Sequence, residues 1–197
     1  MERAQKKVEA RNFDIRKTLI KFDDVMNDQR QVIFSQRLKI LKNKNVEKIL
    51  DDFLNEVINN LETVRNIYQK SNDKKTYLTS IKNTFGNAIS DEDLISIASL
   101  NKEQFSQKIK NIYLSKKKKR IDIIGNEENN NLEKKIFLQI IDFAWRSHLQ
   151  YLEQLRQVIG LRSYGQKDPL SEFKKEAFAL FEGLLEKIKN DVIKFLL

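Results

Sequence analysis

Residues Leu155–Phe178 read LRQVIGLRSYGQKDPLSEFKKEAF, and this stretch decides how the second half of the chain folds. It contains the only proline, Pro169, and two of the five glycines, Gly160 and Gly165. On both sides apolar residues recur in steps of three and four, which predicts one buried face on each of two α-helices. The two stripes are Leu138, Ile141, Trp145, Leu149, Leu152, Leu155 and Ile159, and then Leu170, Phe173, Ala177, Leu180, Leu184, Ile188, Val192 and Phe195.

A reversal of the chain is predicted between these two helices. Glycine relaxes the backbone there, Asp168 can accept hydrogen bonds from the free N–H groups of a new helix, and Pro169 suits its first position. We expect a helical hairpin with helices of roughly 28 residues, each about 40 Å long at 1.5 Å per residue. Gly160 and Gly165 also have the spacing of a phosphate-binding loop. That motif requires Lys and then Ser or Thr after the second glycine, whereas this sequence continues QKD, so we interpret the segment as a turn.

Composition favours an all-α protein and excludes several kinds of site. The chain has 197 residues, one proline, five glycines and abundant Lys, Glu, Leu and Ile, and no run of residues predicts a strand. The absence of cysteine excludes disulfides, thiol catalysis and thiolate metal sites. Since His148 is the only histidine, a zinc site would need to consist almost wholly of carboxylates, which argues against one. No signal peptide or membrane-spanning run is apparent.

The net charge of +9 favours anionic partners such as nucleic acid, acidic lipid or an acidic protein surface. A lysine-rich solvated surface explains the same charge equally well. The most concentrated positive charge is the run Lys116, Lys117, Lys118, Lys119 and Arg120. We interpret this run first as a solvated helix end, with contact to anionic lipid as the alternative.

The first 41 residues predict one long helix. Apolar residues recur in steps of three, four or seven, which places them on one continuous stripe about 60 Å long. A helix of this length gains its stability mostly by burying such a stripe, so we expect it to pack against other helices. The stripe consists of Val8, Ile15, Leu19, Phe22, Met26, Ile33 and Ile40.

Residues 42–125 predict a small helical subdomain, and 126–197 the hairpin that packs back on the first helix. Within the subdomain we expect a break near Gly86, a helix start at Ser90, and helices marked by two apolar sets.

Residues 125–131 (GNEENNN) are expected to form a polar linker. We expect Trp145 in the core and His148 as a surface or interface hydrogen-bonding residue, and we find no catalytic constellation. The two apolar sets are Ile49, Phe53, Val57 and Leu61, and then Phe105, Ile109, Ile112 and Tyr113.

Three segments together closely resemble the C-terminal helical region of SecA, the ATP-driven motor of bacterial preprotein export. They are AQKKVEARNFDIRK with FDDVMNDQRQVIF, then WRSHLQYLEQLRQVIGLRSYGQKDPL, and then EFKKEAFALFEGLLEKIKNDV. The matches cover about residues 4–37 and 132–195 in the family's order, while the middle matches in placement and helical character. Val158, Gly160, Ser163 and Gly165 depart from many relatives around the hairpin turn.

The resemblance implies roles that periodicity does not. Residues 1–41 would be the helical scaffold, 42–125 the helical wing and 126–197 the two-helix finger, whose tip enters the SecY channel and contacts the preprotein. Tyr164 falls on the family's fingertip tyrosine. ATP and magnesium would bind in nucleotide-binding domains outside this segment, so no cofactor and no enzymatic activity are expected of the segment itself. The expected tip contacts are Leu161, Arg162, Tyr164, Gln166 and Lys167.

The resemblance also implies partners and a location. The partners would be the SecY complex, a preprotein in transit, and the nucleotide-binding and preprotein-binding domains of the same chain, with an anionic membrane surface possible through Lys116–Arg120. The location would be the cytoplasmic face of the bacterial plasma membrane, with peripheral attachment and no specific nucleic acid. Two other hypotheses are a basic helical module that binds nucleic acid or anionic membrane, and a purely structural coiled coil. The glycine-flanked basic turn argues against the coiled coil.

Overall fold

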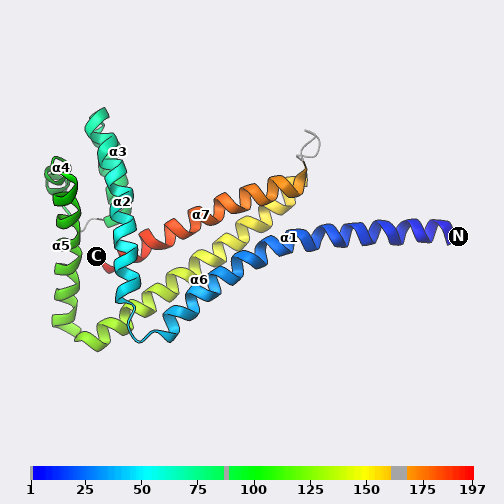
Figure 1. The fold of residues 1–197 in the computed structure, drawn as a ribbon, viewed down its shortest axis with the longest axis horizontal. Helices are drawn as coiled ribbons and strands as arrows, with labels where there is room; N and C mark the ends of the chain where they lie inside the picture. The colour runs from blue at the N-terminus through cyan, green and yellow to red at the C-terminus, as the bar shows by residue number, and fades with distance from the viewer. Residues whose placement is uncertain (1, 87–88, 161–167) are drawn as a thin grey trace. The chain divides into compact units, whose positions relative to one another are not determined.

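The computed structural model describes residues 2–86, 89–160 and 168–197. Within these ranges it is all-α, as predicted, with seven helices and no strand (Figure 1). None of the described helices combines the length and the apolarity needed to cross a membrane. The helices are α1 (Glu2–Lys42), α2 (Glu47–Ser71), α3 (Lys74–Phe85), α4 (Asp91–Ala98), α5 (Lys102–Ile124), α6 (Asn126–Ile159) and α7 (Pro169–Leu196).

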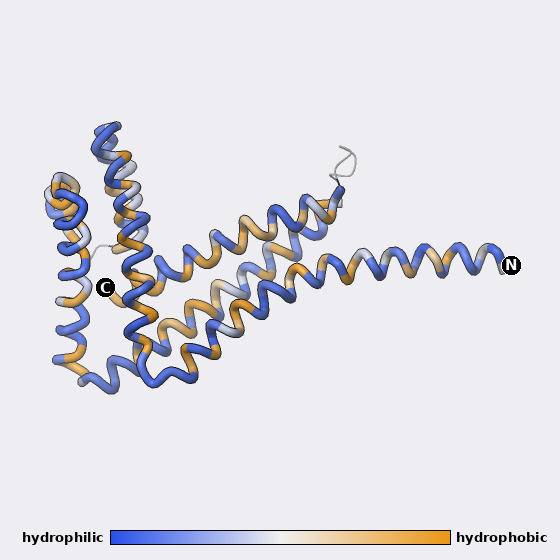
Figure 2. Tube along the Cα trace, viewed as in Figure 1, coloured by the Kyte–Doolittle hydropathy of each residue, from blue (hydrophilic) through white to orange (hydrophobic). Residues whose placement is uncertain are grey.

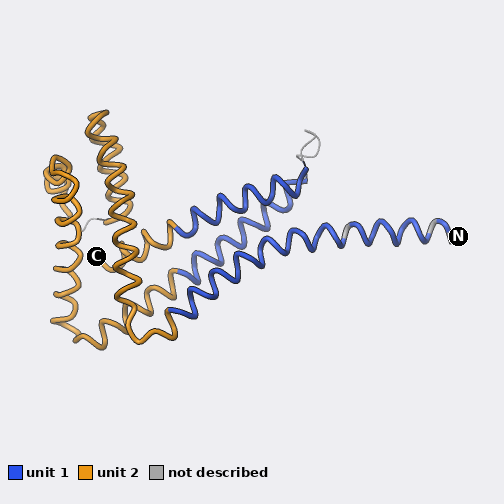
Figure 3. The backbone as a smooth tube through the Cα atoms, viewed as in Figure 1, with its two compact units in different colours: residues 1–39, 141–185 blue, residues 40–140, 186–197 orange. Residues whose placement is uncertain are grey.

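The chain divides into two compact units (Figure 3). Unit 1 comprises residues 1–39 and 141–185, which are most of α1 and the adjoining parts of α6 and α7. Unit 2 comprises residues 40–140 and 186–197, which are α2–α5 and the remaining ends of the three long helices. The units group residues by contact, whereas the predicted segments follow the sequence, so the boundaries at 41 and 125 stay a prediction.

In unit 1, α1 packs beside α6 and α7 through the apolar faces that the sequence indicates. Trp145 is buried, as predicted, at 8% exposure. The predicted stripe of α7 is wrong at Leu180, which is 39% exposed, while the neighbouring Phe181 is buried. Ala177, Phe181 and Leu184 also follow steps of four and three, so periodicity alone does not distinguish the two choices. The Phe181 ring packs 5.8 Å from the His148 ring, which is the tertiary contact that selects it.

The stripe of α1 is buried over only part of its length. Phe22 and Ile33 are buried, and Met26 is half-buried. Val8 and Leu19, nearer the N-terminus, are 58% and 43% exposed, and the side chain of Ile15 lies outside the described set. Hydrophobic residues nevertheless recur along α1 towards its N-terminal end (Figure 2). The expected packing through this stripe is therefore wrong at Val8 and Leu19 within unit 1.

In unit 2, the helix boundaries follow local signals. Gly86 ends α3 at a φ of 60°, and the Ser90 side chain caps α4 by accepting from the Asp93 N–H, both as predicted. At the end of α7, Phe195 is 68% exposed and Leu196 is buried, which corrects the last position of the predicted stripe. The core of α2 and α5 includes Leu50, Leu54, Val57, Ile58, Leu61, Phe105, Ile109 and Tyr113.

The predicted polar linker at 125–131 is wrong. Only Gly125, at a φ of 85°, separates α5 from α6, and the remaining residues form the first turns of α6. Glu127 and Glu128 suit this position because carboxylates are stabilised by the dipole at a helix N-terminus. Asn129 is 1% exposed, so the asparagines that suggest a solvated linker are partly a packing surface.

Candidate functional site

The hairpin turn is the first candidate site, and the structure describes the residues on either side of it. The predicted tip contacts Leu161, Arg162, Tyr164, Gln166 and Lys167 lie outside the described residues. The helix α6 ends at Ile159 and α7 begins at Pro169. The structure therefore describes the two helix ends that flank the tip segment in the sequence.

An apolar cluster includes residues at the end of α6 and at the start of α7. Its buried members come from all three helices of unit 1, with Val25, Met26 and Leu170 packed against it. The rings of Phe22 and Phe173 meet edge to face, with their centroids 4.9 Å apart, which is a favourable geometry for two aromatic quadrupoles. The cluster therefore joins α1 to both arms of the hairpin where they approach the turn. Its buried members are Phe22, Leu152, Leu155, Ile159, Phe173 and Ala177.

Asp168 fixes the point at which α7 begins, as the sequence predicts. Its Oδ2 accepts hydrogen bonds from the backbone N–H of Ser171 at 3.0 Å and from the Ser171 hydroxyl at 2.6 Å. These bonds favour the ionised carboxylate and hold the pKa of Asp168 below its ordinary value. With Pro169 at the first helical position, the start of the second arm is set by local chemistry.

A buried polar clasp joins the three helices of unit 1 at the level of His148. Gln29 Nε2 donates to the carbonyl of Ala177 at 3.0 Å, which leaves Gln29 Oε1 to face His148 Nε2 at 2.8 Å. An amide oxygen only accepts, so this contact requires a proton on His148 Nε2. Burial lowers the pKa of His148, which keeps the ring neutral. His148 is thus the interface hydrogen-bonding residue that the sequence indicates, and Gln29 is its partner.

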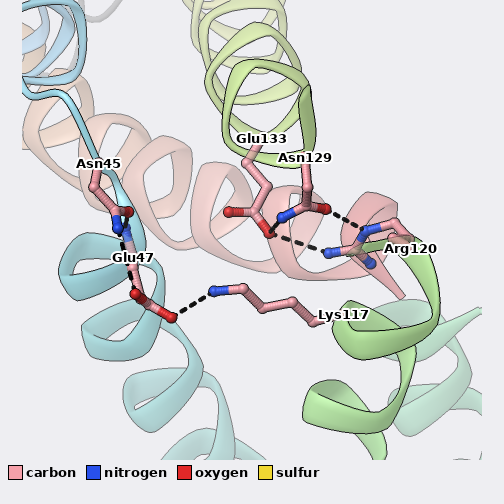
Figure 4. Close-up of polar contacts among 6 residues, drawn as sticks. All are labelled: Asn45, Glu47, Lys117, Arg120, Asn129 and Glu133. Carbon is pink, nitrogen blue, oxygen red and sulfur yellow. Dashed lines mark hydrogen bonds and ion pairs between the residues drawn. The ribbon is translucent and has the colours of Figure 1, made fainter. Parts of the chain in front are cut away.

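The basic run is the second candidate site, and its residues point in different directions. Lys117 Nζ lies 2.7 Å from Glu47 Oε1, and the Lys117 side chain is only 12% exposed (Figure 4). The hydrogen bond and charge of Lys117 lower the pKa of Glu47. The backbone N–H of Glu47 donates to Asn45 Oδ1 at 2.7 Å. Lys117 therefore links α5 to the start of α2.

Arg120, one turn further along α5, also faces inward (Figure 4). Its Nε donates to Asn129 Oδ1 and its Nη2 to Glu133 Oε1, both at 3.2 Å, and Asn129 Nδ2 donates to the same Glu133 oxygen at 3.0 Å. Its Nη1 donates to the backbone carbonyl of Leu196 at the end of α7. Glu133 is 1% exposed, so its charge is stabilised by this pairing rather than by water.

The other members of the run are more open to solvent. Lys118 and Lys119 are exposed and Lys116 is half-buried. The structure thus does not bring the five cations together on one surface. Residues three apart share a helix face, which explains why Lys117 and Arg120 turn inward together.

Three of these polar residues carry a signal that sequence reasoning missed. Gln29 lies seven residues after Phe22 and four before Ile33, so it occupies a position of the apolar stripe. A polar residue on a buried face requires a partner. Asn129 and Glu133 lie four residues apart on α6, which also places them on one face, but the expected linker concealed this spacing.

Comparison with known proteins places the whole chain in one family. Residues 1–197 match the model described as SecA Wing and Scaffold domain. The chain is 49% identical over 197 residues to the protein translocase subunit SecA of Pelagibacter ubique, covering all of this chain and 23% of that protein. It is 38% identical over 200 residues to the protein of the same name from Bartonella bacilliformis, of which it covers 22%. The chain therefore spans less than a quarter of the length of these relatives.

Proposed function

The chain belongs to the SecA family, as its wing and scaffold domain, and from this we propose that it is the C-terminal helical part of a preprotein translocase motor. In this proposal α1 is the scaffold, α2–α5 the wing, and α6 with α7 the two-helix finger. ATP hydrolysis in nucleotide-binding domains outside this chain drives preproteins through the SecY channel. The segment supplies no catalytic residue of its own, and ATP and magnesium act in the other domains.

One observation carries the proposal for the finger: both arms of the hairpin are packed against α1 where they adjoin the turn in sequence. The cluster around Phe22 and Phe173 joins both arms to α1, and the Asp168 cap fixes the first turn of α7. A segment that pushes on a polypeptide must transmit force to its support without unwinding. Helical arms that are packed to the last residues before the turn meet this requirement better than a mobile loop.

The exposed part of the α1 stripe supports the scaffold role. Val8 and Leu19 lie on a helical stripe that is buried further along, yet they are exposed within unit 1. Large apolar side chains aligned on one face favour a protein contact. We assign this face to the nucleotide-binding and preprotein-binding domains of the parent protein.

Membrane contact is the part of the proposal that concerns the basic run. We place the parent protein at the inner face of the bacterial plasma membrane, attached peripherally to the SecY complex. Within the basic run, Lys117 and Arg120 are engaged with Glu47 and Glu133, so contact with anionic lipid depends on Lys118 and Lys119. The same inward pairing argues against a nucleic-acid site, which requires a continuous cationic surface.

A substitution at the tip tests the finger role in the full-length protein. We expect Tyr164→Ala to reduce preprotein transport into SecY-containing vesicles while ATP hydrolysis continues, because an amphipathic ring suits contact with varied polypeptides. Tyr164→Phe should retain more transport than Tyr164→Ala. The matched control is Tyr151→Ala, which removes an exposed tyrosine from α6 away from the turn. Full transport by a stable Tyr164→Ala variant, or an equal loss in the Tyr151→Ala control, would remove the fingertip from the mechanism.

A further inference from the structure

The last turn of α7 is packed among the helices of unit 2. Val192, Ile193 and Leu196 are each at most 1% exposed. Earlier in the same part of α7, Lys189 pairs with Glu56 and lies 5.9 Å from the centre of the Phe53 ring, both on α2. The end of α7 is therefore in contact with α2, and it also presents backbone carbonyls that have no partner within the helix.

One side chain from α5 supplies a donor to this helix end. Arg120 Nη1 donates to the Leu196 carbonyl, and a cation at a helix C-terminus is also favoured by the helix dipole. The guanidinium does not reach this carbonyl as a free, flexible cation. Its Nε and Nη2 are held by Asn129 and Glu133 of α6, which leaves Nη1 directed at α7.

We propose that Arg120 is a positioning residue that fixes the end of α7 to the wing helix α5, with Asn129 and Glu133 of α6 orienting its guanidinium. Three helices thus meet at one side chain. The base of the hairpin, formed by the first turns of α6 and the last turns of α7, is joined to the wing within unit 2. This connection through Arg120 does not depend on the proposal that the finger moves polypeptide.

The alternative explanation is that Arg120 only forms a stabilising ion pair with Glu133. The two explanations differ in what a second substitution at Glu133 can restore. Removing Arg120 alone leaves the Glu133 charge buried and unpaired, which destabilises the protein under both explanations. Replacing both members of a buried pair by apolar residues often restores stability. Such a replacement cannot restore a donor to the Leu196 carbonyl. If Arg120 positions α7, the double variant therefore regains stability while the end of α7 stays less ordered.

Hydrogen exchange on the 197-residue chain tests this difference. In Arg120→Met we expect the melting temperature to fall and the backbone amides of residues 191–196 to exchange at least tenfold faster. In Arg120→Met with Glu133→Leu we expect most of the melting temperature to return while these amides still exchange fast. The matched control is Lys119→Met, which removes the neighbouring exposed cation from the same run and should change neither quantity.

Three outcomes would overturn the assignment. The first is slow exchange at the end of α7 in Arg120→Met. The second is recovery of slow exchange together with the melting temperature in the double variant, which would reduce Arg120 to a partner for Glu133. The third is equal acceleration in Lys119→Met, which would make the effect one of net charge.

Discussion

At the residue scale, the most informative side chain is the single histidine. His148 is 4% exposed and its ring lies 5.5 Å from that of Trp145 and 5.8 Å from that of Phe181, while Nε2 contacts Gln29. A buried imidazole that must stay neutral makes stability depend on pH. The chain offers an unusually clean measurement because no other side chain here has an ordinary pKa between pH 5 and 7.

The sign of this pH dependence follows from the lowered pKa of His148. Above the ordinary pKa of about 6.5, both folded and unfolded chains carry a neutral ring and the stability is at its full value. As the pH falls through that value the unfolded chain binds a proton that the folded chain does not, so stability decreases. We expect the melting temperature of the wild type to fall from pH 7 to pH 5.

A substitution identifies the group responsible for this pH dependence. In His148→Gln, whose amide can still donate to Gln29, we expect the melting temperature to be nearly constant from pH 7 to pH 5. Thermal unfolding followed by circular dichroism measures both curves. Parallel curves for the two proteins would show that another group titrates and that His148 is already protonated or exposed.

At the element scale, the shortest helix depends on side chains from another helix. The helix α4 has only eight residues, and its C-terminal region presents carbonyls to α2. Arg65 Nη1 donates to the Leu100 carbonyl at 2.6 Å and Gln69 Nε2 to the Ala98 carbonyl at 2.8 Å. Arg65 is 5% exposed and also lies over the Phe105 ring at 5.1 Å. The helix therefore ends against a cation and an amide that replace its missing intrahelical donors.

Removing this cap should loosen α4 selectively. For Arg65→Met, which keeps most of the buried aliphatic stem, we expect a loss of about 1.5–3 kcal/mol of unfolding free energy, as for hydrogen bonds to charged groups. Urea unfolding measures the loss, and hydrogen exchange should show the largest acceleration in Asp91–Ala98. Lys70→Met removes an exposed cation from the same helix and serves as the control. Uniform acceleration across unit 2 would contradict a local cap.

Helix boundaries can be predicted from the sequence, whereas the contacts between distant helices cannot. Periodicity and capping residues predict α1, the start of α4 at Ser90 and the start of α7 at Pro169, because these depend on neighbouring residues. The contacts of Gln29 with Ala177 and of Arg120 with Leu196 join residues 148 and 76 positions apart. Spacing indicates which face is buried but does not identify such partners. The predicted burial of Leu180 and Phe195 is wrong because the adjacent residues, Phe181 and Leu196, fit the same spacing and are the buried ones.

For the candidate site, the tip residues stay a prediction, and the basic run shows what residue types leave open. Resemblance to a family names Tyr164 and the tip, and residue types name the basic run. Neither indicates that Lys117 and Arg120 face inward, because a run of five cations on a helix contains both faces. Carboxylates contributed by other helices decide the direction, and these are Glu47 from α2 and Glu133 from α6.

At the scale of the whole molecule, the exposed part of the α1 stripe leaves large apolar side chains in contact with solvent in unit 1. We expect Val8→Ser with Leu19→Ser to leave the stability of the isolated chain within about 0.5 kcal/mol, since exposed side chains contribute little. In the full-length protein the same variant should change the rate of ATP hydrolysis, because α1 would contact the nucleotide-binding domains. Thermal unfolding and steady-state phosphate release measure the two effects.

A matched pair of substitutions controls for general damage to α1. Lys17→Ser with Arg3→Ser alters exposed polar positions on the other side of the same helix. We expect this control to leave the rate of ATP hydrolysis at the wild-type value. A rate unaffected by the stripe variant would show that this face of α1 does not regulate the motor.

The long separation between Gln29 and Ala177 also has a consequence for synthesis on the ribosome. Once Gln29 has been added, translation must advance 148 positions along the chain before Ala177 is made. At about 5–20 residues per second this takes roughly 7–30 s. During that interval the nascent chain carries Phe22 and Ile33 without the hairpin that later buries them. The contacts among α2–α5 are closer in sequence and can form meanwhile, so the face of α1 that packs on the hairpin is covered later than these contacts form.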